Sequence, residues 1–147
     1  MSLLQGLAER LAVAGLASWR ASGAYADADP WPIYLEHVPA SPDRVITLTA
    51  YAAGQADSLL PYDPVRVQAR TRTARDESPT VSRDRAQALY DELHGLGPIT
   101  LPGGARVQLA LALGTPTYLG ADKNDRNEHT VNFELEILNP NRRGRSA

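Results

Sequence analysis

The chain has 147 residues, a length typical of one compact domain, and its 43% hydrophobic and 22% charged content is ordinary for a protein that buries a core. Its net charge of -2, from 15 Lys and Arg against 17 Asp and Glu, excludes a strong overall attraction to a nucleic-acid backbone. Cysteine does not occur, which excludes disulfides, thiolate metal sites and cysteine nucleophiles.

The first half of the chain is predicted to form one helix and three strands. Leucines and small residues recur at three- and four-residue steps near the N-terminus, which predicts a helix running to about Ser18. Prolines and aspartates then favour an irregular turn over residues 22–32. Alternating apolar and polar residues predict strands at residues 33–38, 44–51 and 65–72. In the last of these, the polar face is expected to hold Arg66, Gln68, Arg70 and Arg72.

The second half is predicted to add a helix and two strands. Ser78 and Pro79 mark a helix start, and glycines before Pro98 end it. Two alternating segments follow, with expected inward side chains Val107, Leu109, Leu111 and Leu113 in one and Val131, Phe133, Leu135 and Ile137 in the other. The order α-β-β-β-α-β-β predicts an α+β fold, with a mostly antiparallel sheet of about five strands and two helices packed on one face.

A polar run, LGADKNDRNEH at residues 119–129, raises the question of a metal or catalytic site. As a calcium loop starting at Asp122 it lacks the required glycine and the closing glutamate. Zinc is disfavoured because His129 has no second histidine at ligand spacing. A small hydrolase using His129 with Asp122 or Glu128 is an alternative, but a solvated surface histidine is the simpler interpretation. We expect a polar turn that leads into a strand, with no metal, cofactor or catalytic residue.

Two connections are long for a small domain, at residues 52–63 and 114–129, and long ordered loops usually bind something. Leu59 and Leu60 in the first loop are expected either to anchor a partner or to be buried in the protein's own core. After residue 139 the chain continues with Arg142, Arg143 and Arg145, which predicts a flexible basic C-terminal segment over residues 140–147. No segment is long and apolar enough to span a bilayer, and no secretory signal is recognisable, so we expect a cytosolic protein.

Several segments together resemble a known family. They are LLQGLAERLA, IYLEHVPASPDRVITLTAY, VRVQARTR, AQALYDELHGL and YLGADKNDRNEHTVNFELEI, which span nearly the whole chain. The most specific pieces are VQARTR and the spaced residues Leu119, Gly120, Asp122, Arg126, Asn132 and Phe133. In this pattern the sequence resembles the tail terminator proteins of long-tailed bacteriophages, also called tail completion or minor capsid proteins.

The resemblance implies one tail-terminator-like domain over residues 1–139 with a structural role and no enzymatic activity. It implies a homohexameric ring that caps the head-proximal end of the tail tube, ends tail polymerisation and joins the tail to the head completion or neck protein. Double-stranded DNA would pass through the pore without specific binding. The expected location is the virion, and the host cytoplasm during assembly. A different phage neck or baseplate adaptor of similar fold is an alternative.

Contacts with other subunits or with the tail tube are expected on the long loops and on the wet face of the sheet. The residues predicted for this interface are Leu59, Leu60, Tyr62, Arg66, Arg70, Tyr118, Asp122, Arg126, Glu134 and Glu136. The charged members suit pairing across strands or across subunits, where exposed pairs mainly determine register and partner choice.

Overall fold

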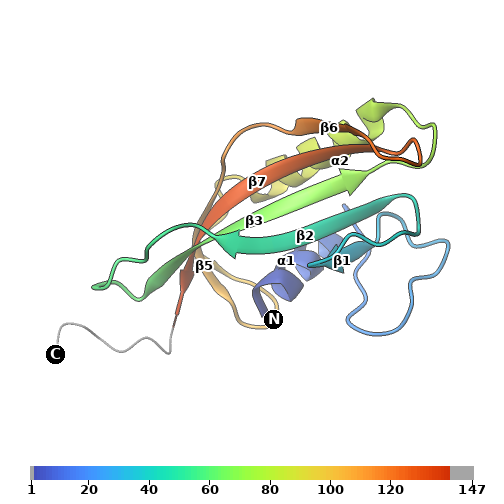
Figure 1. Ribbon diagram of the computed structural model, residues 1–147. Helices are drawn as coiled ribbons and strands as arrows, with labels where there is room; N and C mark the ends of the chain where they lie inside the picture. The colour runs from blue at the N-terminus through green and yellow to red at the C-terminus, as the bar shows by residue number, and fades with distance from the viewer. Residues whose placement is uncertain (1, 140–147) are drawn as a thin grey trace.

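The computed structural model describes residues 2–139, which form two helices and one seven-stranded sheet (Figure 1). The elements in chain order are α1 (Ser2–Val13), β1 (Ile33–Leu35), β2 (Val45–Ala52), β3 (Tyr62–Arg72), α2 (Pro79–Leu93), β4 (Ile99–Thr100), β5 (Arg106–Ala112), β6 (Thr117–Ala121) and β7 (Asn127–Leu138). Neighbouring strands follow the order β1-β2-β3-β7-β5-β4, and β6 pairs with the first residues of β7. The predicted basic segment at residues 140–147 lies outside the described residues.

The α+β class is confirmed, but the predicted sheet differs in strand number and direction. β4 has only two residues, and β6 lies inside the expected loop 114–129. A strand is recognised in a sequence by alternating apolar and polar residues. β4 is too short to show this alternation, and β6 is mostly exposed and does not need it. The sheet is mixed, since β1 runs parallel to β2 while the other pairings are antiparallel.

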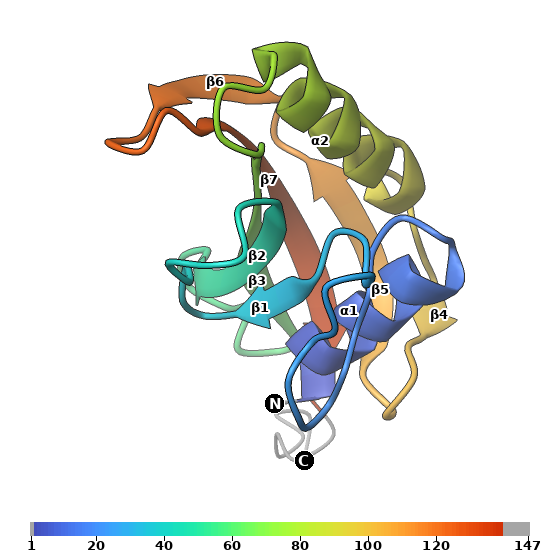
Figure 2. The same ribbon diagram turned by 90° about the vertical axis from the view of Figure 1, so that its right-hand side faces the viewer.

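Both helices lie on the same side of the curled sheet, but they cover different parts of it (Figure 2). α1 contacts β1 and β2, and α2 contacts β3, β5 and β7. α1 also approaches the turn between β4 and β5 so closely that a Cβ added at Gly6 would lie 2.7 Å from the carbonyl oxygen of Pro102. The two helices were expected to form a single layer, but they cover two separate areas of the sheet. Neither helix lies on the other face of the sheet (Figure 2). Neither helix in residues 2–139 is long and apolar enough to cross a membrane.

α1 ends at Val13, earlier than the predicted Ser18, because Gly15 stops it. Gly15 adopts a left-handed φ of 79°, and the Leu16 N–H donates to the carbonyl oxygen of Leu11 at 3.0 Å. This is a Schellman arrangement, in which a left-handed glycine lets the last helical carbonyls find donors. The buried side of α1 consists of Leu3, Leu4, Leu7, Ala8 and Leu11. These side chains form a core with the apolar face of the central strands.

The start of α2 is confirmed, since the Ser78 side chain accepts a hydrogen bond from the Thr80 N–H at 3.3 Å and Pro79 is the first helical residue. The inward orientation of β7 is also confirmed. Its buried side chains are Val131, Phe133 and Leu135, and Ile137 packs half-buried beside them.

Strand β5 contains a bulge that reverses the predicted orientation of its leucines. The pairing register with β7 shifts between Val107 and Leu109. Val107 is buried as expected and Leu109 is half-buried, but Leu111 and Leu113 are 44% and 51% exposed, so the prediction that they point inward is wrong. A bulge adds one residue to one strand, and the side chains that follow it change face. Ala110 occupies the buried position instead.

Candidate interaction surfaces

The outer face of the sheet, on the side away from both helices, carries charged side chains from β3 and β7. Arg66 lies opposite Glu134, and its Nε donates to Glu134 Oε1 at 3.1 Å. Arg70 reaches diagonally to Glu128 and donates to both carboxylate oxygens at 2.8 Å, which raises the pKa of Arg70. Glu136 is exposed on the same face. The Arg66–Glu134 pair is exposed and adds little stability, so it mainly favours one strand register.

Four exposed apolar side chains lie where β5 ends and β6 begins, and we call them the β5–β6 rim. They are Leu111, Leu113, Tyr118 and Leu119, each 44% to 51% exposed. Leu111 lies opposite Glu134 on the outer face, whereas Tyr118 lies opposite the buried His129. The far edge of β6 pairs with no other strand among residues 2–139. Exposed apolar side chains near an unpaired strand edge are a common feature of protein contact sites.

The loop between β2 and β3, residues 53–61, exposes two leucines, and we call it the leucine loop. Leu59 and Leu60 are 73% and 51% exposed, so the alternative that they are buried in the protein's own core is wrong. Asp57 shapes the turn, since its Oδ1 accepts from the Leu59 N–H at 2.8 Å and its carbonyl oxygen accepts from the Leu60 N–H at 3.3 Å. Figure 1 shows the loop extending beyond the end of the sheet, away from β6. Tyr62, at the start of β3, is half-buried.

The polar run at residues 122–126 forms the turn between β6 and β7, which confirms the prediction of a polar turn that leads into a strand. Asp122 Oδ1 accepts from the N–H groups of Asn124 and Arg126 at 2.8 and 3.0 Å, and its Oδ2 accepts from Arg126 Nε at 2.9 Å. Burial acts to raise the pKa of Asp122, but these hydrogen bonds together lower it below its usual value. Asp125 adopts a left-handed φ of 58°, which aspartate tolerates in turns. The Asp122 carboxylate is thus occupied in shaping the turn.

Two buried arginines fasten the loop of residues 39–43 to the sheet. Arg72 donates to three carbonyl oxygens of this loop at 2.7 to 2.8 Å. Arg126 donates to the Ala40 carbonyl oxygen at 2.7 Å and to the Asp43 carboxylate at 3.2 Å. Arg72 is only 2% exposed and burial lowers its pKa, so the prediction that it faces solvent is wrong. Buried guanidinium groups need such partners, and here the loop backbone supplies them.

His129 is buried, although the sequence indicated a solvated surface residue. Its Nδ1 lies 2.6 Å from the Ser82 hydroxyl oxygen in α2, and the ring of Tyr118 packs against it with centroids 5.1 Å apart. Burial lowers the pKa of His129, and the charge of Arg83 lowers it further. Both effects favour the neutral form of the imidazole.

The hydrolase alternative gains no support from these contacts. Ser82 is fully buried, so its hydroxyl is closed to a substrate. Asp122 and Glu128, the expected partners of His129, are hydrogen-bonded to arginines instead. The Ser82–His129 hydrogen bond joins α2 to β7.

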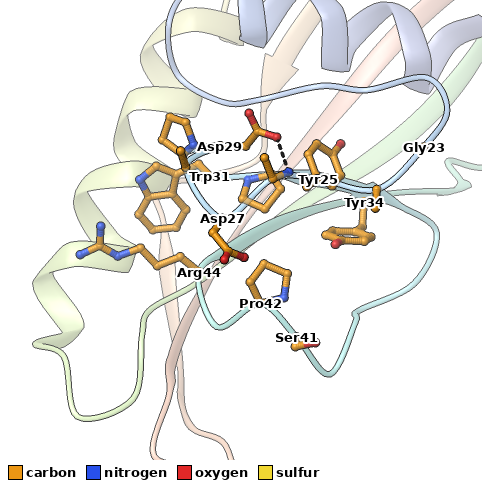
Figure 3. A pocket seen from close by; sticks show the side chains of 14 residues that line it. Gly23, Tyr25, Asp27, Asp29, Trp31, Tyr34, Ser41, Pro42 and Arg44 are labelled. Atoms are coloured by element: carbon orange, nitrogen blue, oxygen red, sulfur yellow. Dashed lines mark hydrogen bonds between the residues drawn. The ribbon is translucent and has the colours of Figure 1, made fainter.

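A cleft of about 770 Å³ opens beside β1, between residues 23–34 and residues 41–44 (Figure 3). The aromatic rings of Tyr25, Trp31 and Tyr34 line it together with three prolines. Trp31 has a φ of 49°, which bulky residues rarely adopt. The guanidinium groups of Arg44 and Arg85 lie over its ring, 5.6 and 5.0 Å from the centroid, and hold the indole in place.

The predicted interface residues do not gather on one surface. The structure brings Arg66, Arg70, Glu134 and Glu136 together on the outer face, places Leu59, Leu60 and Tyr62 at the β2–β3 end, leaves Tyr118 on the rim and puts Asp122 and Arg126 in the β6–β7 turn. Sequence reasoning missed the cleft, because residues 22–32 have no periodic pattern. The signal that was available is three aromatic residues among prolines within ten positions.

A family model described as bacteriophage tail terminator protein matches residues 10–139. The match runs from α1 to the end of β7, so it includes the outer face, the leucine loop, the β5–β6 rim and the cleft. A search of curated protein sequences found no significant match.

Proposed function

Because this chain belongs to the bacteriophage tail terminator family, a group of structural tail proteins, we propose that its copies form a homohexameric ring at the head-proximal end of the tail tube. The ring ends tube polymerisation by covering the surface to which the next tube subunit would bind. Its opposite side meets the head completion or neck protein. Its location is the virion, after assembly in the host cytoplasm.

The observation that carries the ring proposal is the presence of two separate exposed apolar surfaces. A ring closed by rotation needs two different surfaces on each subunit, one for each neighbour, whereas a two-fold dimer needs only one. The leucine loop extends from one end of the sheet, whereas the β5–β6 rim lies where β5 ends and β6 begins (Figure 1). We assign the leucine loop of one subunit to the rim of the next, which would cover Leu59 and Leu60 with Leu111, Leu113, Tyr118 and Leu119.

The charged outer face supports a second contact, with the tail tube protein. Arg66, Arg70, Glu134 and Glu136 present both signs of charge on a face that no helix covers. Such a surface contributes little affinity but selects orientation and partner by complementary charge. The net charge of -2 suits a pore through which DNA moves, because a basic lining would bind the duplex and slow its passage.

The test is the assembly state of the purified chain, alone and with polymerising tail tube protein. Negative-stain images and mass photometry should give six-fold rings of six chains, and added rings should appear at one end of each tube and stop its growth. A strict monomer that leaves tube length unchanged would contradict the proposal. Rings that never bind tubes would favour a different neck or baseplate position.

A further inference from the structure

The cleft beside β1 combines aromatic rings with an unpartnered carboxylate. The rings of Tyr25 and Tyr34 lie 5.4 Å apart, and Trp31 forms another part of the wall. Figure 3 shows the Asp27 side chain between Trp31 and Tyr34. No hydrogen bond or ion pair joins its carboxylate to any of residues 2–139. Aromatic faces beside a free carboxylate suit a cationic side chain, because ring and charge both attract it.

The other charges of the cleft are already compensated. Asp29 accepts from Arg20 Nε at 2.9 Å, and this hydrogen bond lowers its pKa. Arg44 is hydrogen-bonded to both carboxylate oxygens of Glu77, which raises the pKa of Arg44. The charge left without a partner in the cleft is therefore the negative one of Asp27.

Residues 140–147, PNRRGRSA, carry the complementary chemistry, and we call them the arginine segment. They contain three arginines and no acidic residue. Without these three positive charges the net charge of the chain falls from -2 to -5. The protein outside the segment is thus acidic, and the segment holds a fifth of all Lys and Arg residues in the chain, 3 of 15.

The arginine segment starts far from the cleft of its own chain. Asn139, the residue before it, donates from its N–H to the Pro61 carbonyl oxygen at 2.7 Å and from its side chain to Asp63 Oδ2 at 2.9 Å. β7 therefore ends beside the leucine loop, at the end of the molecule opposite to β1, which the cleft adjoins (Figure 1). Eight residues reach at most about 27 Å when fully extended. A neighbouring copy that binds the leucine loop would lie at the same end of the molecule as Asn139.

We propose that the arginine segment of one copy binds in the cleft of a neighbouring copy, with a guanidinium group against the tyrosine rings and next to Asp27. The inference rests on the proposed ring, in which the cleft of one copy must lie within about 27 Å of Asn139 of another. It gives the ring a second link between subunits besides the apolar contact of the leucine loop. Once one of the two contacts has formed, it keeps the groups of the other contact close together and so raises their effective concentration.

Disulfide trapping tests the proposal, since the chain has no cysteine of its own. One preparation carries Ser146→Cys in the arginine segment, and a second carries Ser41→Cys at the cleft. The matched control is Ala14→Cys, an exposed position at the end of α1 that lies in none of the assigned surfaces. After mixing and mild air oxidation, the Ser146→Cys and Ser41→Cys pair should form linked dimers about tenfold faster than the pair with Ala14→Cys. Equal rates would overturn the proposal.

Three further measurements make the result specific. Asp27→Asn in the Ser41→Cys preparation keeps the shape of the side chain and removes its charge, so disulfide trapping should slow several-fold. Trapping of the original pair should also slow in 0.5 M NaCl, where the Debye length is only about 4 Å. An unchanged rate would remove the charge argument. A chain carrying both Ser41→Cys and Ser146→Cys should form links between chains, and a fast link within one dilute chain would overturn the assignment to a neighbour.

Mass photometry of the same mixtures separates this inference from the function on which it rests. Rings that form normally but trap both cysteine pairs at the same rate would overturn the segment's role and leave the ring intact. Monomers in every mixture would contradict both proposals together.

Discussion

Strand β2 is flanked by two loops of opposite character. The loop before it, residues 39–43, is fastened by Arg72 and Arg126 through hydrogen bonds to its backbone and to Asp43. The loop after it, the leucine loop, makes a short turn of its own and leaves two leucines in solvent. The first loop is held by internal polar contacts, while the second exposes apolar surface.

The contrast between the two loops indicates which side chains are available for contacts with other subunits. Arg126 was predicted to contact another subunit or the tail tube, yet its guanidinium group is hydrogen-bonded to residues of its own chain. Leu59 and Leu60 were expected either to anchor a partner or to be buried in the core, and they are exposed. A buried guanidinium group that is hydrogen-bonded within the chain contributes to folding. An exposed apolar side chain is available for contact with another molecule.

The largest expected effect comes from removing a fastening arginine. In Arg72→Met, three loop carbonyl oxygens lose their donor, and we expect a loss of about 3 kcal/mol in the free energy of unfolding. Urea unfolding followed by tryptophan fluorescence measures it, since Trp31 lies close to this loop. The control is Arg66→Met on the open face, which should cost about 0.5 kcal/mol or less. Equal losses in the two variants would show that burial of the guanidinium does not matter.

The leucine loop should show the reverse pattern, with a large effect on assembly and a small one on stability. Leu59→Asp combined with Leu60→Asp should raise the dissociation constant of the ring about 100-fold, because two buried leucine contacts are lost. The free energy of unfolding of the separated chain should change by about 0.5 kcal/mol or less.

Mass photometry over a dilution series measures the dissociation, and chemical denaturation measures the stability. Val13→Asp is the matched control, because Val13 is 87% exposed at the end of α1 and lies in no assigned surface. Rings that survive the double replacement unchanged would remove the leucine loop from the subunit contact.

Local signals explain which parts of the fold were predictable. α2 has a serine cap and a first-turn proline, and β7 alternates strictly, so both follow from a few adjacent residues. The end of α1 depends on Gly15, which the apolar pattern alone did not reveal. The face of Leu111 depends on a bulge whose partner strand lies more than twenty residues away, and no local pattern encodes it.

The candidate surfaces divide in the same way. The leucine loop was predicted as a binding loop from its length and two apolar residues, although its role as a subunit contact stays a prediction. The fastening of residues 39–43 was not predictable, because Arg126 binds a segment more than eighty residues earlier. The cleft likewise forms from two segments that only the fold brings together.

A smaller effect is expected from pH at His129, which is buried like the fastening arginines but touches Tyr118 of the rim. Burial and Arg83 lower its pKa in the folded chain from an ordinary value of 6.5, so the unfolded chain binds the proton more readily. The free energy of unfolding should therefore be highest above pH 6.5 and should fall as the pH drops through the lowered value. Urea unfolding between pH 7.5 and 5 measures the fall, and His129→Gln should reduce it. The same fall in that variant would assign the effect to other groups.

The smallest effects are expected on the outer face, where the two ion pairs differ in burial. Arg66 and Glu134 both have 40% exposed side chains, so a double-mutant cycle to alanine should give a coupling of about 0.5 kcal/mol that shrinks in 0.5 M NaCl. Arg70 instead serves Glu128, whose side chain is only 7% exposed. Losing Arg70 leaves that carboxylate buried and unpaired, so Arg70→Ala should cost more than Arg66→Ala and be less sensitive to salt. If the two alanine variants lose the same free energy of unfolding and respond equally to salt, burial of the carboxylate does not determine which ion pair on this face stabilises the fold.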